Sequence, residues 1–284
     1  MRLNRFDPSS INVRGGGGGG FPGGAGGGIG CGTLVIALIA ALVFGVDPSS
    51  MLGGVQQGGP SATQQGDGSS QSTEQLCTQN EYATEACNAL QSLDQTWAPE
   101  FQRAGIEFKQ PTLVFYQGGT SSGCGSASSA MGPFYCPSDE GIYIDTSFYD
   151  QMAQQLGARG DFARYYVIAH EYGHHIQKLT GVADSIRSAQ SQNPQAANQL
   201  QVRMELQADC YAGVWAGKNR NLVEPGDFEE GMTAASSIGD DKLTGGRVSA
   251  ENFTHGTSAQ RMEALRAGME SGNDTVCDRY VQMR

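Results

Sequence analysis

Three of the four histidines of this chain lie in one short stretch, and two of them have the spacing of a metal site. The stretch is VIAHEYGHHIQ, in which His170 and His174 are four positions apart and Glu171 directly follows the first. Side chains four apart on a helix leave from the same face, so both imidazoles can reach one zinc ion. Zinc lowers the pKa of its bound water towards neutrality, and an adjacent carboxylate can accept the proton. We therefore predict a hydrolytic zinc site with His170 and His174 as ligands and Glu171 as general base.

Two other residues of this stretch have separate expected roles. Gly173 has no Cβ, so we expect another element to approach the helix closely at that position. His175 follows His174 by one residue and therefore faces about 100° away from it on a helix. We interpret His175 as an ordinary core or surface histidine that does not bind the metal.

A third ligand must come from elsewhere in the chain, because two histidines do not complete a zinc site. The segment LQVRMELQADCYAGVWAG, residues 200–217, has apolar residues at helical spacing and predicts a second buried helix. Within it Glu205 can supply a carboxylate ligand, and Asp209 can accept a hydrogen bond from a ligand imidazole. Two alternatives stay open: the two acids form a solvent-facing stripe, or His255 in NFTHGTSAQR is the third ligand.

The histidine stretch lies within a longer segment that is typical of a helix. DFARYYVIAHEYGHHIQKLTG starts at Asp161, a residue type favoured at N-caps, and ends at Gly181, which is favoured at C-caps. Its apolar residues recur at the spacing of one helical face. The segment predicts a helix of about four or five turns that presents His170 and His174 on one side.

The cysteines indicate an oxidising compartment. Seven occur, and six remain when Cys31, which lies in an apolar segment, is set aside. An even set of this kind is typical of disulfides outside the cytoplasm. The pairings that we favour are Cys124 with Cys136, whose intervening loop is short, Cys77 with Cys87, and Cys210 with Cys277. The alternative for Cys210 is a small apolar residue on a buried helix face.

The N-terminal part of the chain differs in composition from the rest. Residues 1–28 contain GGGGGGFPGGAGGG, which offers few side chains to bury, so we expect a disordered arm. Residues 29–46 carry no charge and are long enough to cross a bilayer once as a helix. Residues 47–76 are rich in Gly, Gln and Ser and predict a flexible tether. Residues 77–284 then form the folded domain.

The apolar segment, residues 29–46, is best interpreted as an uncleaved single-pass signal anchor. Arg2, Arg5 and Arg14 precede it and Asp47 follows it, so the N-terminus is expected in the cytoplasm and the domain outside the cytoplasmic membrane. A cleaved signal peptide would need a small-residue cleavage site, and FGVDPSS has none. A buried core helix seldom stands alone between a glycine arm and a polar tether.

Charge and missing motifs exclude several other functions. Lys and Arg number 18 against 29 for Asp and Glu, and the formal charge of -11 opposes binding to nucleic acid. The sequence has no GxSxG motif, so a serine hydrolase of that type is unsupported. The cysteines lack a neighbouring histidine pattern that would favour a thiol nucleophile.

Several motifs in order resemble one family. HEYGHH, ELQADCYAGVW, IGDD and THGTSAQR, together with CGSASSAMGPFYCPSDEGIYID, are similar to the bacterial neutral zinc metallopeptidase family of the thermolysin-like gluzincin group. The similarity runs from about Cys124 to Arg261. It implies an α+β, zincin-like domain in which helices pack beside a small antiparallel sheet. The edge strand of that sheet would hold an extended peptide, with residues 112–116 and 141–145 as candidate strands and residues 134–144 as a hairpin. The alternative is that both are core strands without contact to substrate.

The resemblance also implies roles for individual residues. His170, His174 and Glu205 would bind one Zn²⁺ per chain, Glu171 would be the catalytic base, and Asp209 would support a ligand. His255 lies in the segment similar to HGTSAQR, where its position suggests a role in transition-state stabilisation.

Together these features predict a membrane-anchored zinc metallopeptidase that cleaves a peptide or protein substrate outside the cytoplasmic membrane and contacts lipid through residues 29–46. The alternative from another class is a catalytically silent zinc-binding scaffold that holds a partner of the cell envelope. Digestion of proteins or peptides with and without a chelator would separate the two.

Overall fold

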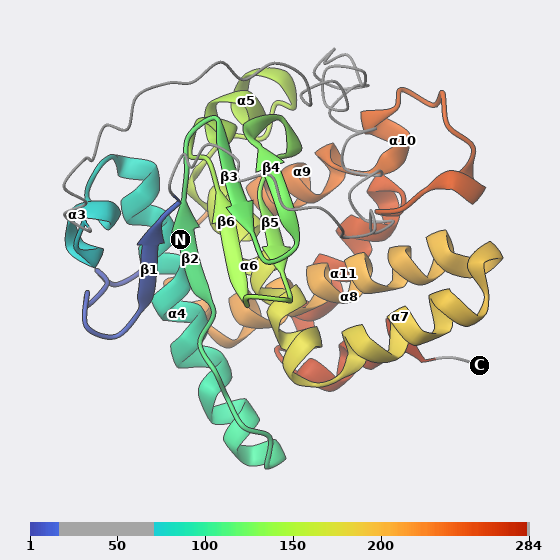
Figure 1. The fold of residues 1–284 in the computed structure, drawn as a ribbon, viewed down its shortest axis with the longest axis horizontal. Coiled ribbons are helices and arrows are strands. Elements are labelled where there is room, and N and C mark those ends of the chain that lie inside the picture. Colours follow the sequence, from blue (N-terminus) through green and yellow to red (C-terminus); the bar gives the residue numbers. More distant parts are fainter. Residues whose placement is uncertain (17–70, 283–284) are drawn as a thin grey trace, which may run out of the picture.

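The computed structural model describes residues 1–16 and 71–282, in which helices pack against one four-stranded sheet (Figure 1). The described part is an α+β structure, as predicted. The sheet has the order β1 (Asn12–Gly15), β2 (Thr112–Phe115), β6 (Gly141–Ile144) and β5 (Phe134–Cys136). A separate hairpin is formed by β3 (Gly119–Ser122) and β4 (Gly125–Ser128).

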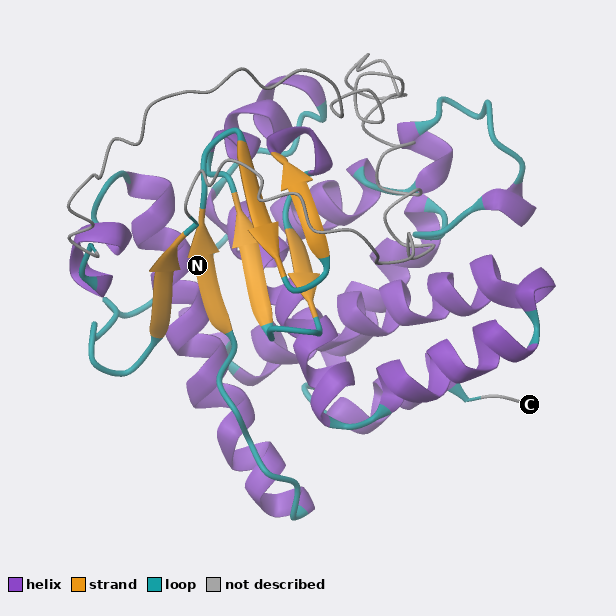
Figure 2. Cartoon of the chain, in the orientation of Figure 1, coloured by secondary structure: helices purple, strands orange, loops and turns teal. Residues whose placement is uncertain are grey.

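Most of the helices come after the strands in the chain and do not alternate with them. They are α3 (Thr73–Cys77), α4 (Glu81–Ala104), α5 (Ser147–Gln155), α6 (Asp161–Leu179), α7 (Val182–Gln192), α8 (Ala197–Lys218), α9 (Asp227–Ser237), α10 (Asp240–Leu243), α11 (Ser258–Ser271) and α12 (Asp278–Val281). Helices α4 and α6 lie behind the sheet, and α7, α8 and α11 lie on the side of the molecule away from β1 (Figure 2).

The sheet is mixed, and the predicted antiparallel sheet is wrong in this respect. β1 pairs with β2 and β2 pairs with β6 in parallel, and only β5 is antiparallel to its neighbour β6. The predicted hairpin of residues 134–144 is present as β5 and β6. The two candidate edge strands, β2 and β6, both lie inside the sheet, with every residue of β6 buried. Runs without polar alternation are typical of strands that are covered on both faces.

Small residues let the central helices approach one another closely. A Cβ placed on Gly173 of α6 would lie 2.8 Å from the Cα of Ala208 in α8, so no larger residue fits there. This is the close approach that the sequence predicted at Gly173. Gly213 of α8 lies against the carbonyl of Leu265 in α11, where a Cβ would also clash. The three helices are therefore packed backbone to backbone around the site described below.

The N-terminal segment, residues 1–16, is part of the fold, so the predicted disordered arm over residues 1–28 is wrong for these residues. Met1, Phe6 and Ile11 are buried in the main core, and β1 extends the sheet. The glycine run dominated the sequence-based prediction, although the apolar residues that precede it are enough to anchor the segment. Residues 17–28 lie outside the described residues.

The other predicted boundaries are tested only at their ends. The predicted anchor, residues 29–46, lies outside the described residues, and none of the helices that the structure describes is long and apolar enough to cross a membrane. The predicted tether of residues 47–76 extends too far. Ser72 caps α3 through a hydrogen bond to the backbone of Gln75, and Leu76 is buried, so the folded domain begins at about residue 72.

Three disulfides join the six cysteines of the described residues, in the pairs that the sequence favoured. The bonds are Cys77–Cys87, Cys124–Cys136 and Cys210–Cys277. The last bond ties α8 to the C-terminal 3-10 turn of residues 274–277. Each closes a loop and so restricts the unfolded chain.

Candidate metal centre

Helix α6 carries the histidine stretch through the middle of the molecule. It spans Asp161–Leu179, close to the predicted extent, but the N-cap is Gly160 and the C-cap is Thr180, so the predicted caps at Asp161 and Gly181 are wrong by one residue each. Its neighbour α8 carries the second segment singled out in the sequence, and both helices are buried where they face each other. Glu205 and Asp209 are 5% and 0% exposed, which excludes the alternative of a solvent-facing acidic stripe.

The structure brings together two imidazoles and one carboxylate, which we call the histidine cluster: His170, His174 and Glu205. Oε2 of Glu205 lies 3.1 Å from Nε2 of His170 and 3.5 Å from Nε2 of His174. Ligand atoms about 2.0 to 2.2 Å from a tetrahedral zinc ion lie about 3.3 to 3.6 Å from one another. The 3.5 Å separation falls in this range and the 3.1 Å separation lies just below it, so the three groups fit as ligands of one zinc ion, which leaves a fourth position for water.

Each member of the histidine cluster is held from behind by another side chain. Nδ1 of His170 lies 2.8 Å from Oδ1 of Asp209, and Nδ1 of His174 lies 2.9 Å from Oε1 of Gln177. An acceptor at each Nδ1 requires the proton there, which leaves Nε2 free to bind a metal. The third member, Glu205, accepts a hydrogen bond from Gln201 on the oxygen that points away from the histidines, at 2.8 Å.

Asp209 is the centre of a buried network that extends to α11. Its Oδ1 accepts hydrogen bonds from the hydroxyl of Tyr166 at 2.6 Å and from the guanidinium of Arg261 at 2.8 Å. Its Oδ2 accepts a second bond from Arg261, also at 2.8 Å. Arg261 is only 1% exposed, and its charge balances that of Asp209. A bidentate pair of this kind fixes the carboxylate that in turn orients His170.

The ionisation states agree with a cation-binding centre. Burial raises the pKa of Glu205, but the imidazoles of His174 and His170 outweigh it and hold the pKa well below its usual range. Burial likewise opposes ionisation of Asp209, and Arg261 and His170 lower its pKa. Burial lowers the pKa of His170, but Asp209 and Glu205 raise it to about 10 when no metal competes. The two carboxylates are therefore ionised at neutral pH.

Glu171 lies beside the histidine cluster without belonging to it. Its side chain is on the next position of α6 and is 8% exposed. Among the described residues its carboxylate has no hydrogen-bond partner, which sets it apart from Glu205 and Asp209. Burial lowers the pKa of His174, but Glu205 outweighs it and raises the pKa, and the neighbouring Glu171 adds a smaller contribution in the same direction. A carboxylate in this position is free to accept a proton.

His255 is close to the centre but is not one of the three converging groups. Its Nδ1 lies 3.2 Å from Oδ1 of Asp240, and its charge contributes to lowering the pKa of Glu205. Oδ2 of Asp240 accepts the backbone N–H groups of Thr254, His255 and Gly256 at 2.7, 2.6 and 3.0 Å. Asp240 therefore fixes this loop, and the alternative of His255 as third ligand is not supported, because Glu205 occupies that place.

His175 points away from the histidine cluster into the core. It is fully buried, its Nε2 lies 2.6 Å from the carbonyl oxygen of Lys109, and its Nδ1 lies 2.9 Å from the hydroxyl of Tyr135. Burial lowers the pKa of His175, so the ring is neutral. It connects α6 to β5, the edge strand that carries Tyr135.

A second group of converging ligands, the acidic cluster, consists of Asp161, Asp227 and Glu230. In the structure the α-ammonium of Met1 lies 2.8 Å from Oδ1 of Asp227 and 3.0 Å from Oδ2 of Asp161. Glu230 accepts the backbone N–H of Phe162 at 3.1 Å. The cluster is thus occupied by groups of the chain itself.

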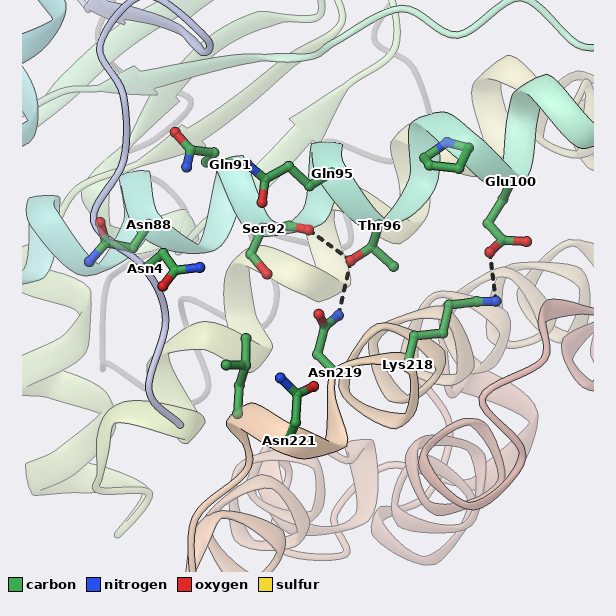
Figure 3. A pocket seen from close by; sticks show the side chains of 12 residues that line it. Asn4, Asn88, Gln91, Ser92, Gln95, Thr96, Glu100, Lys218, Asn219 and Asn221 are labelled. Carbon is green, nitrogen blue, oxygen red and sulfur yellow. Dashed lines mark hydrogen bonds and ion pairs between the residues drawn. The ribbon is translucent and has the colours of Figure 1, made fainter.

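A cavity of about 380 Å³ lies away from the histidine cluster, between α4, the end of α8 and the N-terminal segment (Figure 3). Amide and hydroxyl side chains line it, and its charged pair, Glu100 and Lys218, is 2.7 Å apart. Several of these amides bind the chain itself. Asn88 accepts the N–H of Phe6, and Asn219 donates to Thr96. The cavity is part of the junction that holds the N-terminal segment.

Sequence reasoning missed four residues around the histidine cluster: Gln177, Gln201, Tyr166 and Arg261. A weak signal existed for the two glutamines, which are three residues after His174 and four residues before Glu205 and so share a helical face with them. Arg261 lies in THGTSAQR, a motif that was noted without a role for its arginine. Tyr166 is four residues before His170 and so had the same weak signal, but its contact with Asp209 could be found only from the structure.

The sequence was compared with known proteins. A profile of the family described as "Putative neutral zinc metallopeptidase" matches residues 4–280. The chain is 45% identical to the uncharacterized protein YpfJ of Escherichia coli strain K12 over 254 residues, which are 87% of this chain and 85% of that protein. It is 39% identical to the uncharacterized protein Rv2575 of Mycobacterium tuberculosis strain H37Rv over 205 residues, which are 66% of this chain and 67% of that protein. No solved structure matches the chain.

Proposed function

Because the chain belongs to the neutral zinc metallopeptidase family, we propose that it is a zinc-dependent peptidase with His170, His174 and Glu205 as ligands of one zinc ion. One observation carries the proposal. The ligand atoms of His170, His174 and Glu205 converge within 4.8 Å, with the carboxylate oxygen 3.1 and 3.5 Å from the two imidazole nitrogens, and the outer atom of each ligand is hydrogen-bonded to another side chain. Ordinary buried ion pairs do not need this arrangement.

The chain's own residues would supply the proton transfer. Bound zinc would acidify a water molecule so that it is a nucleophile at neutral pH. Glu171 is the carboxylate beside the cluster that has no other hydrogen-bond partner in the described residues. It would accept the proton and deliver it to the leaving nitrogen of the peptide. Asp209 would hold His170 in the required tautomer, with Arg261 holding Asp209.

The loop that carries His255 supports a role for this residue as a hydrogen-bond donor in the proposed reaction. Asp240 accepts from Nδ1 of the ring and from three backbone N–H groups of the same loop, which fixes the direction of Nε2. We propose that Nε2–H stabilises the oxygen that becomes negative during peptide hydrolysis. The role is secondary to that of Glu171, because it supports the reaction without moving the proton of the water.

The substrate we propose is an extended peptide that lies along β5. β5 is the edge strand next to α6, and β2 and β6 are enclosed by other strands. Its residue Tyr135 is tied to His175 of α6, which supports a fixed position of this edge relative to the histidine cluster. An edge strand can bind an extended peptide by main-chain hydrogen bonds.

We also propose that the enzyme works at the cytoplasmic membrane, with its domain on the outer side. Three disulfides within one domain support an oxidising compartment. The uncharged residues 29–46 support contact with lipid.

The test is Glu171→Gln in the full-length protein, with Glu229→Gln on the exposed face of α9 as matched control. We expect Glu171→Gln to keep about one zinc ion per chain and to lose about 10²- to 10⁴-fold in peptide cleavage, because a general base contributes this much. The control should match the parent in both. Cleavage at the parental rate by zinc-loaded Glu171→Gln would refute the role of the base. Zinc binding without cleavage by the parent itself would favour the zinc-binding scaffold instead.

A further inference from the structure

The N-terminal segment is joined to the domain along its whole described length. β1 pairs with β2 in parallel over four residues, and the N–H of Phe6 and Asp7 donate to Asn88 and Gln91 of α4. Phe6 is 4% exposed and Ile11 is 5% exposed. Burying one such side chain contributes about 1.5 to 3 kcal/mol. The segment is therefore an integral edge of the sheet and core.

The two ends of the undescribed part of the chain lie side by side. A Cβ on Gly15, at the end of β1, would be 3.9 Å from Oε1 of Gln71 and 3.6 Å from Leu76. The chain thus leaves the domain after Gly16 and re-enters it at Gln71, at nearly the same point. Two points this close to each other lie on the same side of a bilayer.

Between these ends the sequence has one apolar stretch, residues 29–46. Its eighteen residues are enough for no more than one helical crossing, which takes about twenty. We infer that residues 1–16 and the domain lie on the same side of the membrane. This differs from the single-pass arrangement, with the N-terminus in the cytoplasm, that the sequence predicts.

The arginines that suggested a cytoplasmic N-terminus have partners in the domain. Arg2 lies 3.0 Å from Glu224, Arg5 lies 3.8 Å from Glu74, and Arg14 lies 3.7 Å from Asp139. Arg14 also donates to the hydroxyl of Tyr143 at 2.7 Å. Each exposed pair contributes little stability, but together they give these charges a role inside the fold. The positive-inside rule is then not needed to explain them.

The test uses the full-length chain in its membrane, with Cys31→Ala to remove the one cysteine outside the three described disulfides. Asn12→Cys and Thr112→Cys stand opposite each other in the β1–β2 register. A short bifunctional thiol reagent should link them, so that the N-terminal fragment stays attached to the domain after cleavage at a protease site introduced within residues 57–68. The matched control, Asn12→Cys with Ser188→Cys on the exposed face of α7, should show no link.

Labelling with a membrane-impermeant maleimide gives a second, independent measurement. Asn12→Cys alone and Ser188→Cys alone, both at exposed positions, should be labelled from the same side of intact spheroplasts. Labelling of the two from opposite sides would overturn the inference, as would the absence of the 12–112 link in disulfide-bonded, folded protein. Neither measurement depends on zinc or on proteolysis, so the proposed function can fail without affecting this result.

Discussion

Among the described residues, two clusters each bring the ligand atoms of three side chains within 4.8 Å of one another, and the clusters differ in almost every other respect. The histidine cluster combines two imidazoles with Glu205, and each member has a hydrogen-bond partner behind it. The acidic cluster has carboxylates only, and its two aspartates hold the α-ammonium of Met1. Proximity of ligands is therefore a poor guide to a transition-metal site by itself.

The difference lies in what surrounds the ligands. Imidazole nitrogens suit zinc, and carboxylates alone suit harder cations or an ammonium group. The side chains behind the ligands distinguish the two clusters more clearly. Asp209 and Gln177 hold the histidines in the tautomer whose Nε2 can bind a metal, and a simple ion pair does not require one particular tautomer. The acidic cluster is supported by backbone N–H groups instead, and its aspartates hold a cation of the chain itself. The following substitutions test this distinction.

The largest effect is expected from Glu205→Gln, with Asp227→Asn as its counterpart in the acidic cluster. Replacing the carboxylate ligand by a neutral amide should weaken zinc binding by more than the roughly 100-fold that is the upper end for an outer partner. Asp227→Asn should leave the zinc affinity unchanged. Isothermal titration with zinc measures both. Equal losses in the two variants would mean that the histidine cluster has no special role in binding the metal.

The next effect is expected from Asp209→Asn. The amide can present an N–H towards His170 and leaves Arg261 with an unbalanced buried charge, so both the tautomer and the position of the imidazole are less well fixed. Zinc affinity should fall about 10- to 100-fold. The measurement is competition with a chelator of known affinity, on protein whose circular dichroism matches the parent. An unchanged affinity would show that the network behind His170 serves folding alone.

The sequence could predict the inner part of this site because its residues are close in sequence or rare in their context. His170 and His174 are one helical turn apart. Glu205 and Asp209 are acidic residues in a segment whose apolar spacing is otherwise typical of a buried helix. Arg261 is 52 residues from Asp209, its hydrogen-bond partner. No periodicity records a contact of that kind, so it follows only from the packing of α11 against α8.

The fold class could be predicted from the sequence, but the order and the directions of the strands could not. The apolar runs of β2 and β6 indicated strands, and their lack of alternation was a signal for a parallel interior position that was not used. β1 was missed because it is four residues long and stands directly before a glycine run, where composition argues for disorder. Its pairing with β2 spans about 100 residues, which local sequence cannot specify.

A smaller effect is expected from Gln201→Leu. Gln201 is half-buried and donates to the outer oxygen of Glu205, and leucine has a similar volume without the donor. Zinc affinity should fall about tenfold, the lower end for an outer partner. Gln192→Leu at the end of α7, where the side chain is exposed, is a matched control that should bind zinc like the parent. A loss as large as that of Asp209→Asn would place the main support of the site at Glu205 rather than at His170.

The last prediction concerns a buried carboxyl that lacks a cation, in contrast to both clusters. Asp94 accepts from the hydroxyl of Tyr172 at 2.7 Å and from the amide of Gln110 at 3.0 Å, and burial raises its pKa to about 7. The folded protein therefore keeps a proton that the unfolded chain loses above its ordinary value of 3.8. Such a group contributes stability at low pH and loses that contribution as the pH rises through the folded pKa.

Between pH 5 and pH 7 the parent should therefore lose up to about 1.4 kcal/mol of unfolding free energy per pH unit relative to Asp94→Asn, which cannot ionise. Urea unfolding of the two proteins at pH 5, 6, 7 and 8 gives the difference directly. Above pH 7 the two curves should become parallel, because Asp94 is then ionised in both the folded and the unfolded parent. Parallel curves over the whole range would mean that Asp94 is ionised in the folded protein. A buried carboxylate on α4 would then be stable without a neighbouring cation, unlike the carboxylates of the two clusters.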